Sequence, residues 1–280
     1  MTYSLIARDP KTGELGVAVQ SRSFGTGAAV PWATAGIGAV ATQSFTLRSY
    51  GPLALELLRG GDSPASALES LTSQDELRDF RQVAVLDSTG ATAVHTGAAC
   101  IQEAGSVAGD GFSAQGNMLR SAAVVPALAE AFSAAVGSLA ERLLAGLEGA
   151  EGAGGDFRGR EAGAILVVEG EATATNAYDR VADVRVDNHA DPLAELRRLL
   201  SHSEMLRRLR QAAPENVGEL FAEALSVGID EDVARWVAAA GLLDEDPERA
   251  VAFLAPLVAV DERWRAAFST AADAAARAHA

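Results

Sequence analysis

Thr2 is the residue of this sequence whose type and position could carry a reaction with the fewest partners. It follows the initiator methionine, and a side chain as small as that of threonine permits removal of that methionine. Removal would leave a hydroxyl group and a free α-amine on one residue. Because an α-amine titrates near ~8, a useful fraction would be neutral at physiological pH and could accept the hydroxyl proton. The sequence is thus compatible with an N-terminal threonine nucleophile, although Met-Thr also opens many proteins without such activity.

Four charged residues form a second group with chemical potential. Arg22, Asp156, Arg158 and Arg160 could surround a carboxylate substrate, since arginine pairs with carboxylates through two parallel hydrogen bonds. Alternatively, they form structural ion pairs in solvated loops. Asn117 could likewise be an amide of the site or a turn residue that tolerates the left-handed backbone region. The sequence leaves both pairs of alternatives open.

The remaining reactive residue types give weaker signals. His189 lies between Asp187 and Asp191, but an Asp-Pro pair after it is typical of a turn at the start of a helix, so a metal cluster is not expected. Cys100 has no adjacent base and is interpreted as an inert thiol. No phosphate-binding or dinucleotide-binding glycine pattern occurs between a strand and a helix. We therefore expect neither a metal nor a cofactor.

Composition excludes several classes of partner. The net charge is −15 with a single lysine, Lys11, which opposes binding to nucleic acid or to an anionic membrane surface. No apolar run reaches the roughly 18 residues of a membrane span, and the N-terminus lacks the basic start of a signal peptide. One cysteine rules out an internal disulfide. We expect a cytoplasmic protein that acts on a small-molecule substrate, without membrane or nucleic-acid partners.

The elements that must position Thr2 begin with a β-hairpin. Two short apolar runs, residues 2–8 and 15–22, flank a Pro/Gly turn. Two glycine-rich strands follow, and then a helix with Leu53, Ala54, Leu57 and Leu58 on one face and a short helix opened by Ser63-Pro64. Turn signals at residues 87–90 and 109–111 predict two more hairpins, which we interpret as a second antiparallel block.

The second half of the chain contains more helix. Helical spacing predicts helices near residues 124–132, 140–147 and 193–209, with strands at 162–168 and around 184–186. Sheet blocks that alternate with pairs of helices predict an α+β fold, in which two antiparallel sheets are sandwiched between helices. From Pro214 onward the pattern is helical only. We therefore predict a main domain over residues 1–210 and a helical C-terminal domain over residues 214–280.

Four aromatic residues of the C-terminal domain suggest an assembly. Phe221, Trp236, Trp264 and Phe268 are more aromatic surface than a helical segment of this length readily covers by itself. We therefore expect this domain to pack on the main domain or on a second copy, as in a homodimer.

A series of short motifs occurs in a fixed order along the first 200 residues. They are residues 1–4 (MTYS), 7–10 (ARDP), 12–19 (TGELGVAV), 30–33 (VPWA), 36–43 (GIGAVATQ), 49–52 (SYGP), 115–117 (QGN), 154–156 (GGD), 158–160 (RGR) and 193–200 (LAELRRLL). On these motifs the chain resembles the N-terminal-nucleophile (Ntn) hydrolase superfamily and, more closely, an uncharacterised bacterial family, domain-of-unknown-function family 1028. The resemblance covers about seven tenths of the chain and implies a four-layer αββα sandwich with the nucleophile at the start of the first strand.

The resemblance also implies roles for individual residues. Ser21 and Arg22 match the end of the second strand, which approaches the nucleophile. Gln43 and Ser44 match the turn that supplies oxyanion N–H groups. By the same likeness, Asn117 and Asp156 belong to the turns that orient the N-terminal amine.

One feature of proteasome-type members is missing. Their third strand carries a lysine that lowers the pKa of the nucleophile, whereas this chain has Val30-Pro31-Trp32 in that region. Arg22 could supply the positive charge, but it cannot exchange protons because arginine stays ionised.

Two functions follow as hypotheses. The first is an amidohydrolase that cleaves an amide or related acyl bond of a small molecule through Thr2 after removal of Met1, with Arg158 and Arg160 as candidate substrate-binding residues. The second is a non-enzymatic scaffold that keeps the fold and uses its helical C-terminal domain to bind a partner. Relatives sometimes carry a C-terminal segment described as peptidoglycan-binding-like, but no motif here specifies that ligand.

Overall fold

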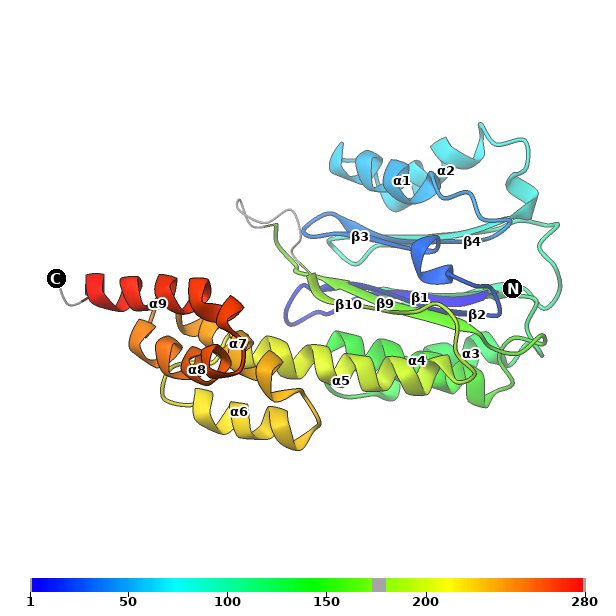
Figure 1. Ribbon diagram of the computed structural model, residues 1–280. Coiled ribbons are helices and arrows are strands. Elements are labelled where there is room, and N and C mark those ends of the chain that lie inside the picture. The colour runs from blue at the N-terminus through cyan, green and yellow to red at the C-terminus, as the bar shows by residue number, and fades with distance from the viewer. Residues whose placement is uncertain (1, 173–179, 279–280) are drawn as a thin grey trace. The chain divides into compact units, whose positions relative to one another are not determined.

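The computed structural model describes residues 2–172 and 180–278 (Figure 1). The chain forms two compact units, unit 1 over Met1–Leu200 and unit 2 over Ser201–Ala280. The division lies inside a helix, before the boundary near residues 210–214 that the sequence suggests. Each unit has its own hydrophobic core.

Unit 1 has a mixed α+β fold built on two antiparallel sheets, as predicted. The larger sheet has the strand order β10-β9-β2-β1-β8-β7. Its strands are β1 (Thr2–Arg8), β2 (Leu15–Ser21), β7 (Gly105–Gly109), β8 (Phe112–Asn117), β9 (Ala162–Val168) and β10 (Arg180–Val186). The predicted N-terminal hairpin is confirmed, since β1 pairs with β2 from Thr2↔Ser21 to Arg8↔Leu15.

The smaller sheet has the order β3-β4-β5-β6. Its strands are β3 (Pro31–Thr34), β4 (Gly38–Ser44), β5 (Arg81–Asp87) and β6 (Thr92–Thr96).

The two hairpins β5-β6 and β7-β8 form as predicted, but the expectation that they make one antiparallel block is wrong. They belong to different sheets, because β8 pairs with β1 (Thr2↔Asn117) instead of extending β6. A turn signal reports local pairing only and does not specify which sheet a hairpin joins.

Alternation along β1 separates two apolar environments. Tyr3, Leu5 and Ala7 belong to the core beneath the helices, whereas Ile6 packs with Ala39 of β4 in the core between the two sheets. Because successive side chains of a strand point to opposite faces, the side chains of Thr2 and Ser4 also point between the sheets. The fold thus places the candidate nucleophile in the interior, where two sheets face each other.

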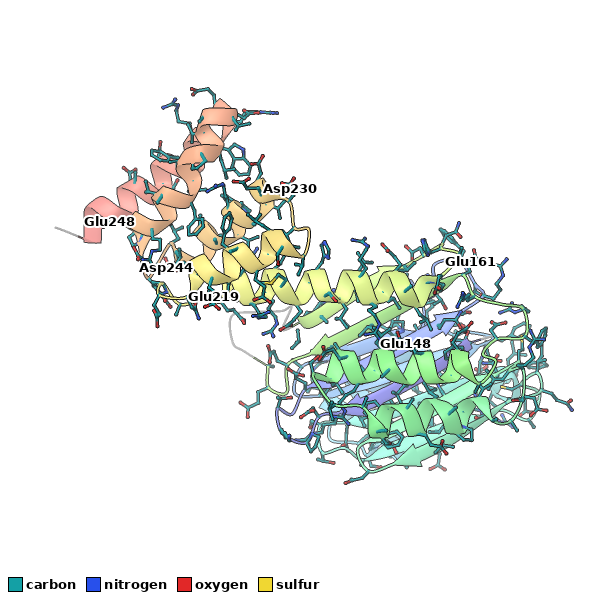
Figure 2. All side chains as sticks on the ribbon, turned by 90° about the horizontal axis from the view of Figure 1, so that it is seen from below. Glu148, Glu161, Glu219, Asp230, Asp244 and Glu248 are labelled. Atoms are coloured by element: carbon teal, nitrogen blue, oxygen red, sulfur yellow. The ribbon has the colours of Figure 1, made fainter. Side chains whose placement is uncertain are left out.

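Helices cover the outer face of each sheet (Figure 1). The smaller sheet carries α1 (Tyr50–Arg59) and α2 (Pro64–Thr72), and the larger carries α3 (Val124–Ala134), α4 (Leu139–Gly152) and the first part of α5 (Pro192–Arg210). Short 3₁₀ turns occur at η1 (Thr26–Ala28) and η2 (Arg78–Phe80). The helix α2 begins at Ser63-Pro64 as predicted, and Ser63 caps it by accepting a hydrogen bond from the N–H of Ser66. In Figure 2, Glu148 of α4 lies toward α5, where its carboxylate pairs with Arg197.

The buried face of α1 differs from the prediction at one residue. Ala54 and Leu58 are buried as expected, but Leu53 is 48% exposed and Leu55 is buried instead. The helix begins at Tyr50, which is itself buried and donates a hydrogen bond to Asp75. Fixing Tyr50 inward rotates Leu55 toward the sheet and Leu53 away from it.

Unit 2 is helical throughout its described residues. After the end of α5 it contains α6 (Val217–Ser226), α7 (Glu231–Leu242), α8 (Pro247–Val260), η3 (Glu262–Trp264) and α9 (Arg265–Ala278). Phe221 and Phe253 pack edge to face, and Trp236 lies 5.4 Å from Trp264 between ring centroids. Phe221, Trp264 and Phe268 pack on the core of the unit itself. Trp236 is 39% exposed, so three of the four aromatic residues are used within the unit, and the dimer remains a prediction.

Among the described residues, no helix combines the length and the hydropathy that crossing a membrane requires.

Candidate functional site

Thr2 lies in a buried, hydrogen-bonded position at the start of β1. Its side chain points between the sheets, and only 6% of the residue is exposed. The Thr2 hydroxyl donates a hydrogen bond of 3.1 Å to Oγ of Ser21. In the sheet Thr2 pairs with Ser21 on one side and with Asn117 on the other, so both neighbours have Cα atoms about 4.5–5.5 Å away. The register therefore brings three of the predicted site residues together.

Polar side chains fill this end of the space between the sheets. Farther along β1 the same space is apolar and contains Ile6, Val17 and Leu86. The polar layer consists of buried residues from five strands: Thr2, Ser4, Ser21, Gln43, Gln82, Ser113, Gln115 and Asn117. Burying so many polar groups costs free energy unless they are hydrogen-bonded, so their concentration at one end marks a site and not a general core.

Gln82 of β5 is the centre of this polar layer, and the sequence analysis missed it. Its Oε1 accepts hydrogen bonds from Nε2 of Gln43 (2.8 Å) and Nδ2 of Asn117 (2.9 Å). Its Nε2 donates to the carbonyl oxygens of Gly116 (2.8 Å) and Gly105 (3.2 Å). A glutamine at an inward position of an otherwise apolar strand was the signal that could have found it.

Two carbonyl oxygens beside Thr2 lack a hydrogen-bond donor. Nε2 of Gln43 faces the oxygens of Thr2 (3.2 Å) and Gln82, which directs Gln43 Oε1 away from both. Among the described residues, no donor reaches Gln43 Oε1 or Asn117 Oδ1, and both atoms are buried. A buried acceptor without a donor costs about 1–3 kcal/mol. The polar layer around Thr2 therefore holds buried acceptors for which the described residues supply no donor.

Backbone strain occurs at the same place. In the described chain, Ser44 (φ 70°) and Met118 (φ 55°) are the residues other than glycine that have a positive φ. Ser44 ends β4 directly after Gln43, and Met118 follows Asn117 at the end of β8. Such conformations cost about 1–3 kcal/mol each and cluster at functional sites. Their position on both sides of the polar layer strengthens the assignment of a site.

The first backbone N–H group after Ser44 already has a hydrogen-bond partner. The N–H of Phe45 donates to the carbonyl oxygen of Phe80 at 3.1 Å, so this amide is not open to a ligand. The group of this turn that reaches Thr2 is the side-chain amide of Gln43, whose Nε2 donates a hydrogen bond to the main-chain carbonyl oxygen of Thr2. The predicted oxyanion role of Gln43 and Ser44 stays a prediction.

Asp156 fixes the loop that follows Ser21. Its carboxylate accepts hydrogen bonds from the main-chain N–H groups of Arg22 (3.1 Å) and Arg158 (2.7 Å), and it pairs with the Arg158 guanidinium at 3.3 Å. The turn that delivers Asp156 needs Gly154 and Gly155, which have φ values of 111° and 50°. The contact is with main-chain atoms next to Ser21, so Asp156 positions that strand end.

The arginine side chains point to other partners. Arg22 pairs with Glu161, with the Arg22 side chain 45% exposed; Figure 2 labels Glu161 at one end of unit 1. Arg160 pairs with Glu151 (3.5 Å), which accepts a hydrogen bond from the Tyr3 hydroxyl (2.9 Å) beneath the helices. Burial, together with the Glu151 carboxylate, raises the pKa of Tyr3 well above its usual value. Tyr3 therefore stays a neutral phenol that ties β1 to α4.

A second buried charge cluster holds the loop after Ser44. Arg81, opposite Ser44 in the sheet, donates to Asp75 (2.8 Å) and to the carbonyl oxygen of Phe45 (2.5 Å), and Tyr50 donates to Asp75 (2.9 Å). The hydrogen bond from Arg81 is the main cause that lowers the pKa of Asp75 from 3.8 to about 2. Because the folded pKa lies below the unfolded one, this cluster stabilises the fold above pH 3.8 and loses that contribution as the pH falls toward 2.

We therefore expect Asp75→Asn to lower the free energy of unfolding at pH 7 by about 2 kcal/mol, since the Asp75 side chain is 11% exposed. The difference from wild type should shrink as the pH falls from 3.8 toward about 2, because the carboxyl group is protonated first in the unfolded chain and then in the folded one. Urea unfolding between pH 2.5 and 7 measures both effects. Glu56→Gln, in an exposed pair with Arg59, is the control and should change stability by less than about 0.5 kcal/mol. Equal losses for both variants would contradict the assigned role of the cluster.

Comparison with known proteins places the chain in a family. Residues 2–196 match the model of a family of unknown function, DUF1028. Among solved structures, the chain is similar to protein SPO2555 from Silicibacter pomeroyi, which belongs to the same family model, with 35% identity and a TM-score of 0.65; the likeness covers 71% of this chain and 84% of that one. No curated protein matches the chain. The chain is therefore a member of the DUF1028 family.

Proposed function

We propose that the protein is an N-terminal-nucleophile amidohydrolase, in which Thr2 becomes the nucleophile after removal of Met1. In this proposal the two facing sheets with helices on both outer faces are the four-layer αββα sandwich of Ntn hydrolases. The observation that carries the proposal is the setting of Thr2: a buried hydroxyl bonded to Ser21, beside two buried acceptors without donors, Gln43 Oε1 and Asn117 Oδ1. Freeing the Thr2 amine would provide donors at that place.

The reaction that this site supports is acyl transfer to water. The Thr2 oxygen attacks the carbonyl carbon of an amide, and the Thr2 amine takes the hydroxyl proton and passes it to the leaving nitrogen as the C–N bond breaks. Water then attacks the resulting ester, which releases a carboxylic acid and restores the Thr2 hydroxyl. Ser21, as hydrogen-bond partner of the Thr2 hydroxyl, is positioned to hold it toward the substrate.

The role of Arg22 changes in this proposal. Because the Arg22 guanidinium pairs with Glu161, its charge is balanced and exposed to solvent, which weakens its effect on the amine. We assign the contribution of Arg22 to its main-chain N–H, which binds Asp156. In the same way, Asp156 acts as a positioning residue and does not exchange protons with the substrate.

Removal of Met1 is the first requirement, and intact-mass spectrometry tests it. We expect protein expressed in bacteria without an N-terminal tag to have lost the mass of one methionine, so that its N-terminal peptide begins with Thr2. An unbiased screen of amides, monitored for release of amine, then searches for the substrate. Full retention of Met1 would exclude the free-amine mechanism and would favour the scaffold hypothesis.

A further inference from the structure

Exposed phenylalanines gather at the end of unit 1 that holds Thr2. Unit 1 has six phenylalanines, of which Phe112 and Phe132 pack together in the core. The other four are exposed: Phe24 by 73%, Phe45 by 63%, Phe157 by 48% and Phe80 by 40%. Single exposed apolar residues are ordinary, but a group of aromatic residues around one site indicates a binding surface.

Each of these four residues is joined closely to the site. Phe45 directly follows Ser44, and Phe80 packs on it with ring centroids 5.5 Å apart. Phe157 directly follows Asp156, and its N–H donates to the carbonyl oxygen of Met118 at 3.5 Å. Phe24 lies two positions after Arg22, whose N–H binds Asp156. We call these four residues the aromatic rim.

Two arginines without an ion pair lie next to the aromatic rim. Arg48 is in the exposed loop that begins with Phe45, and Arg120 donates from Nη2 to the carbonyl oxygen of Phe157 at 3.2 Å. Within the described part of the chain, neither pairs with a carboxylate, whereas the site carboxylates Asp156 and Glu161 are each paired with an arginine. In a chain with a net charge of −15, unpaired cations beside exposed aromatic rings favour an anionic ligand with an apolar part.

We propose that this surface binds the substrate and that the substrate is an amphiphilic amide, in which an apolar acyl group is joined to an amine that bears a carboxylate. The aromatic rim covers the acyl group, and Arg48 and Arg120 attract the carboxylate. This inference rests on the proposed function, since it names the substrate class of the same site.

Charge argues for a small ligand over a second copy of the chain. A twofold contact would place the same surface on both partners and would bring Arg48 and Arg120 of one copy toward those of the other. Facing like charges oppose association. A carboxylate ligand of opposite charge meets no such cost.

Binding to a Thr2→Ala protein tests the inference without turnover. Isothermal titration calorimetry with N-(4-phenylbutanoyl)glycine should give a Kd at least about tenfold lower than with its methyl ester, which lacks the charge, or with N-acetylglycine, which lacks the apolar group. Phe45→Ala should raise the Kd of the full probe about fivefold or more. Arg48→Ala should raise it about three- to tenfold, with no effect on the methyl ester.

Two control variants test whether a change in Kd is specific to the aromatic rim and its arginines. Val136→Ala, which alters a 90% exposed apolar residue between α3 and α4, and Arg8→Ala, at the far end of β1, should leave the Kd unchanged. Equal affinity for the three probes, or no binding of any of them, would overturn the inference. So would a Phe45→Ala variant that changes sedimentation but not the Kd, because the rim would then be a self-association surface.

Failure of the proposed function has a different signature. If the probe binds as expected and wild-type protein does not cleave it, the binding inference stands and the hydrolase proposal fails. If wild-type protein cleaves polar amides through Thr2 with no preference for the amphiphile, the hydrolase proposal stands and the inference on substrate class is wrong.

Discussion

Thr2→Ala is expected to lower the turnover of any amide substrate by at least about a thousandfold, because it removes the attacking oxygen. Thr2→Ser, which keeps a hydroxyl group and an α-amine on the same residue, should retain measurable activity. Initial rates of amine release for the three proteins, at equal concentration and after confirmation of Met1 removal, measure the effect.

Stability measurements separate this effect from misfolding. The Thr2 hydroxyl makes one hydrogen bond in the described structure, to Ser21, so Thr2→Ala should change the free energy of unfolding by only about 1 kcal/mol. A Thr2→Ala protein that is folded and inactive fits the account. A Thr2→Ala protein that turns over substrate at the wild-type rate would move the chemistry to another residue.

Gln82→Met is expected to destabilise the protein by about 3 kcal/mol. The substitution keeps the volume and the apolar stem but removes the acceptor shared by Gln43 and Asn117 and the donor to Gly116 and Gly105. Each buried group left without a partner costs about 1–3 kcal/mol, although relaxation shares part of that cost. Activity should fall as well, because Gln43 and Asn117 lose their common anchor beside Thr2. Urea unfolding and amine-release assays measure the two effects.

Gln20→Met is the matched control. Gln20 is fully buried on the helix-facing side of β2, and neither atom of its side-chain amide has a hydrogen-bond partner among the described residues. Replacing that amide with an apolar thioether should leave stability unchanged or raise it. Similar losses for Gln20→Met and Gln82→Met would show that a glutamine of either kind is simply required for packing, and would contradict the specific role of the Gln82 network.

The sequence predicted local structure well where apolar and polar side chains alternate along a strand and where cap residues mark the start of a helix. The hairpin of β1 and β2 and the helix start at Ser63-Pro64 follow from turn and cap chemistry that acts within a few residues. The arrangement of Thr2 against Ser21 follows directly from that hairpin. By contrast, Leu53 and Leu55 of α1 are equally apolar, and only the inward anchoring of Tyr50 decides which of them is buried.

The rest of the site depends on contacts between distant segments. Gln82 and Asn117 meet because β5 and β8 lie in opposing sheets, and no local pattern encodes that approach. Arg22 also shows that residue type alone does not assign a partner. Its positive charge suggested a role in the site, but in the folded chain the Arg22 side chain pairs with Glu161 and the Arg22 main-chain N–H binds Asp156. Charge and residue type identify candidates, whereas tertiary pairing assigns their partners.

Covalent trapping of Thr2 tests the central claim most directly. A β-lactone acylates a nucleophilic hydroxyl group by ring opening, so the adduct keeps the whole mass of the reagent. We expect one equivalent on the N-terminal peptide that begins with Thr2 in the wild-type protein, no such adduct in Thr2→Ala, and slower labelling in Ser21→Ala. An adduct that forms equally in Thr2→Ala, or amide hydrolysis by a wild-type protein that still begins with Met1, would contradict the account.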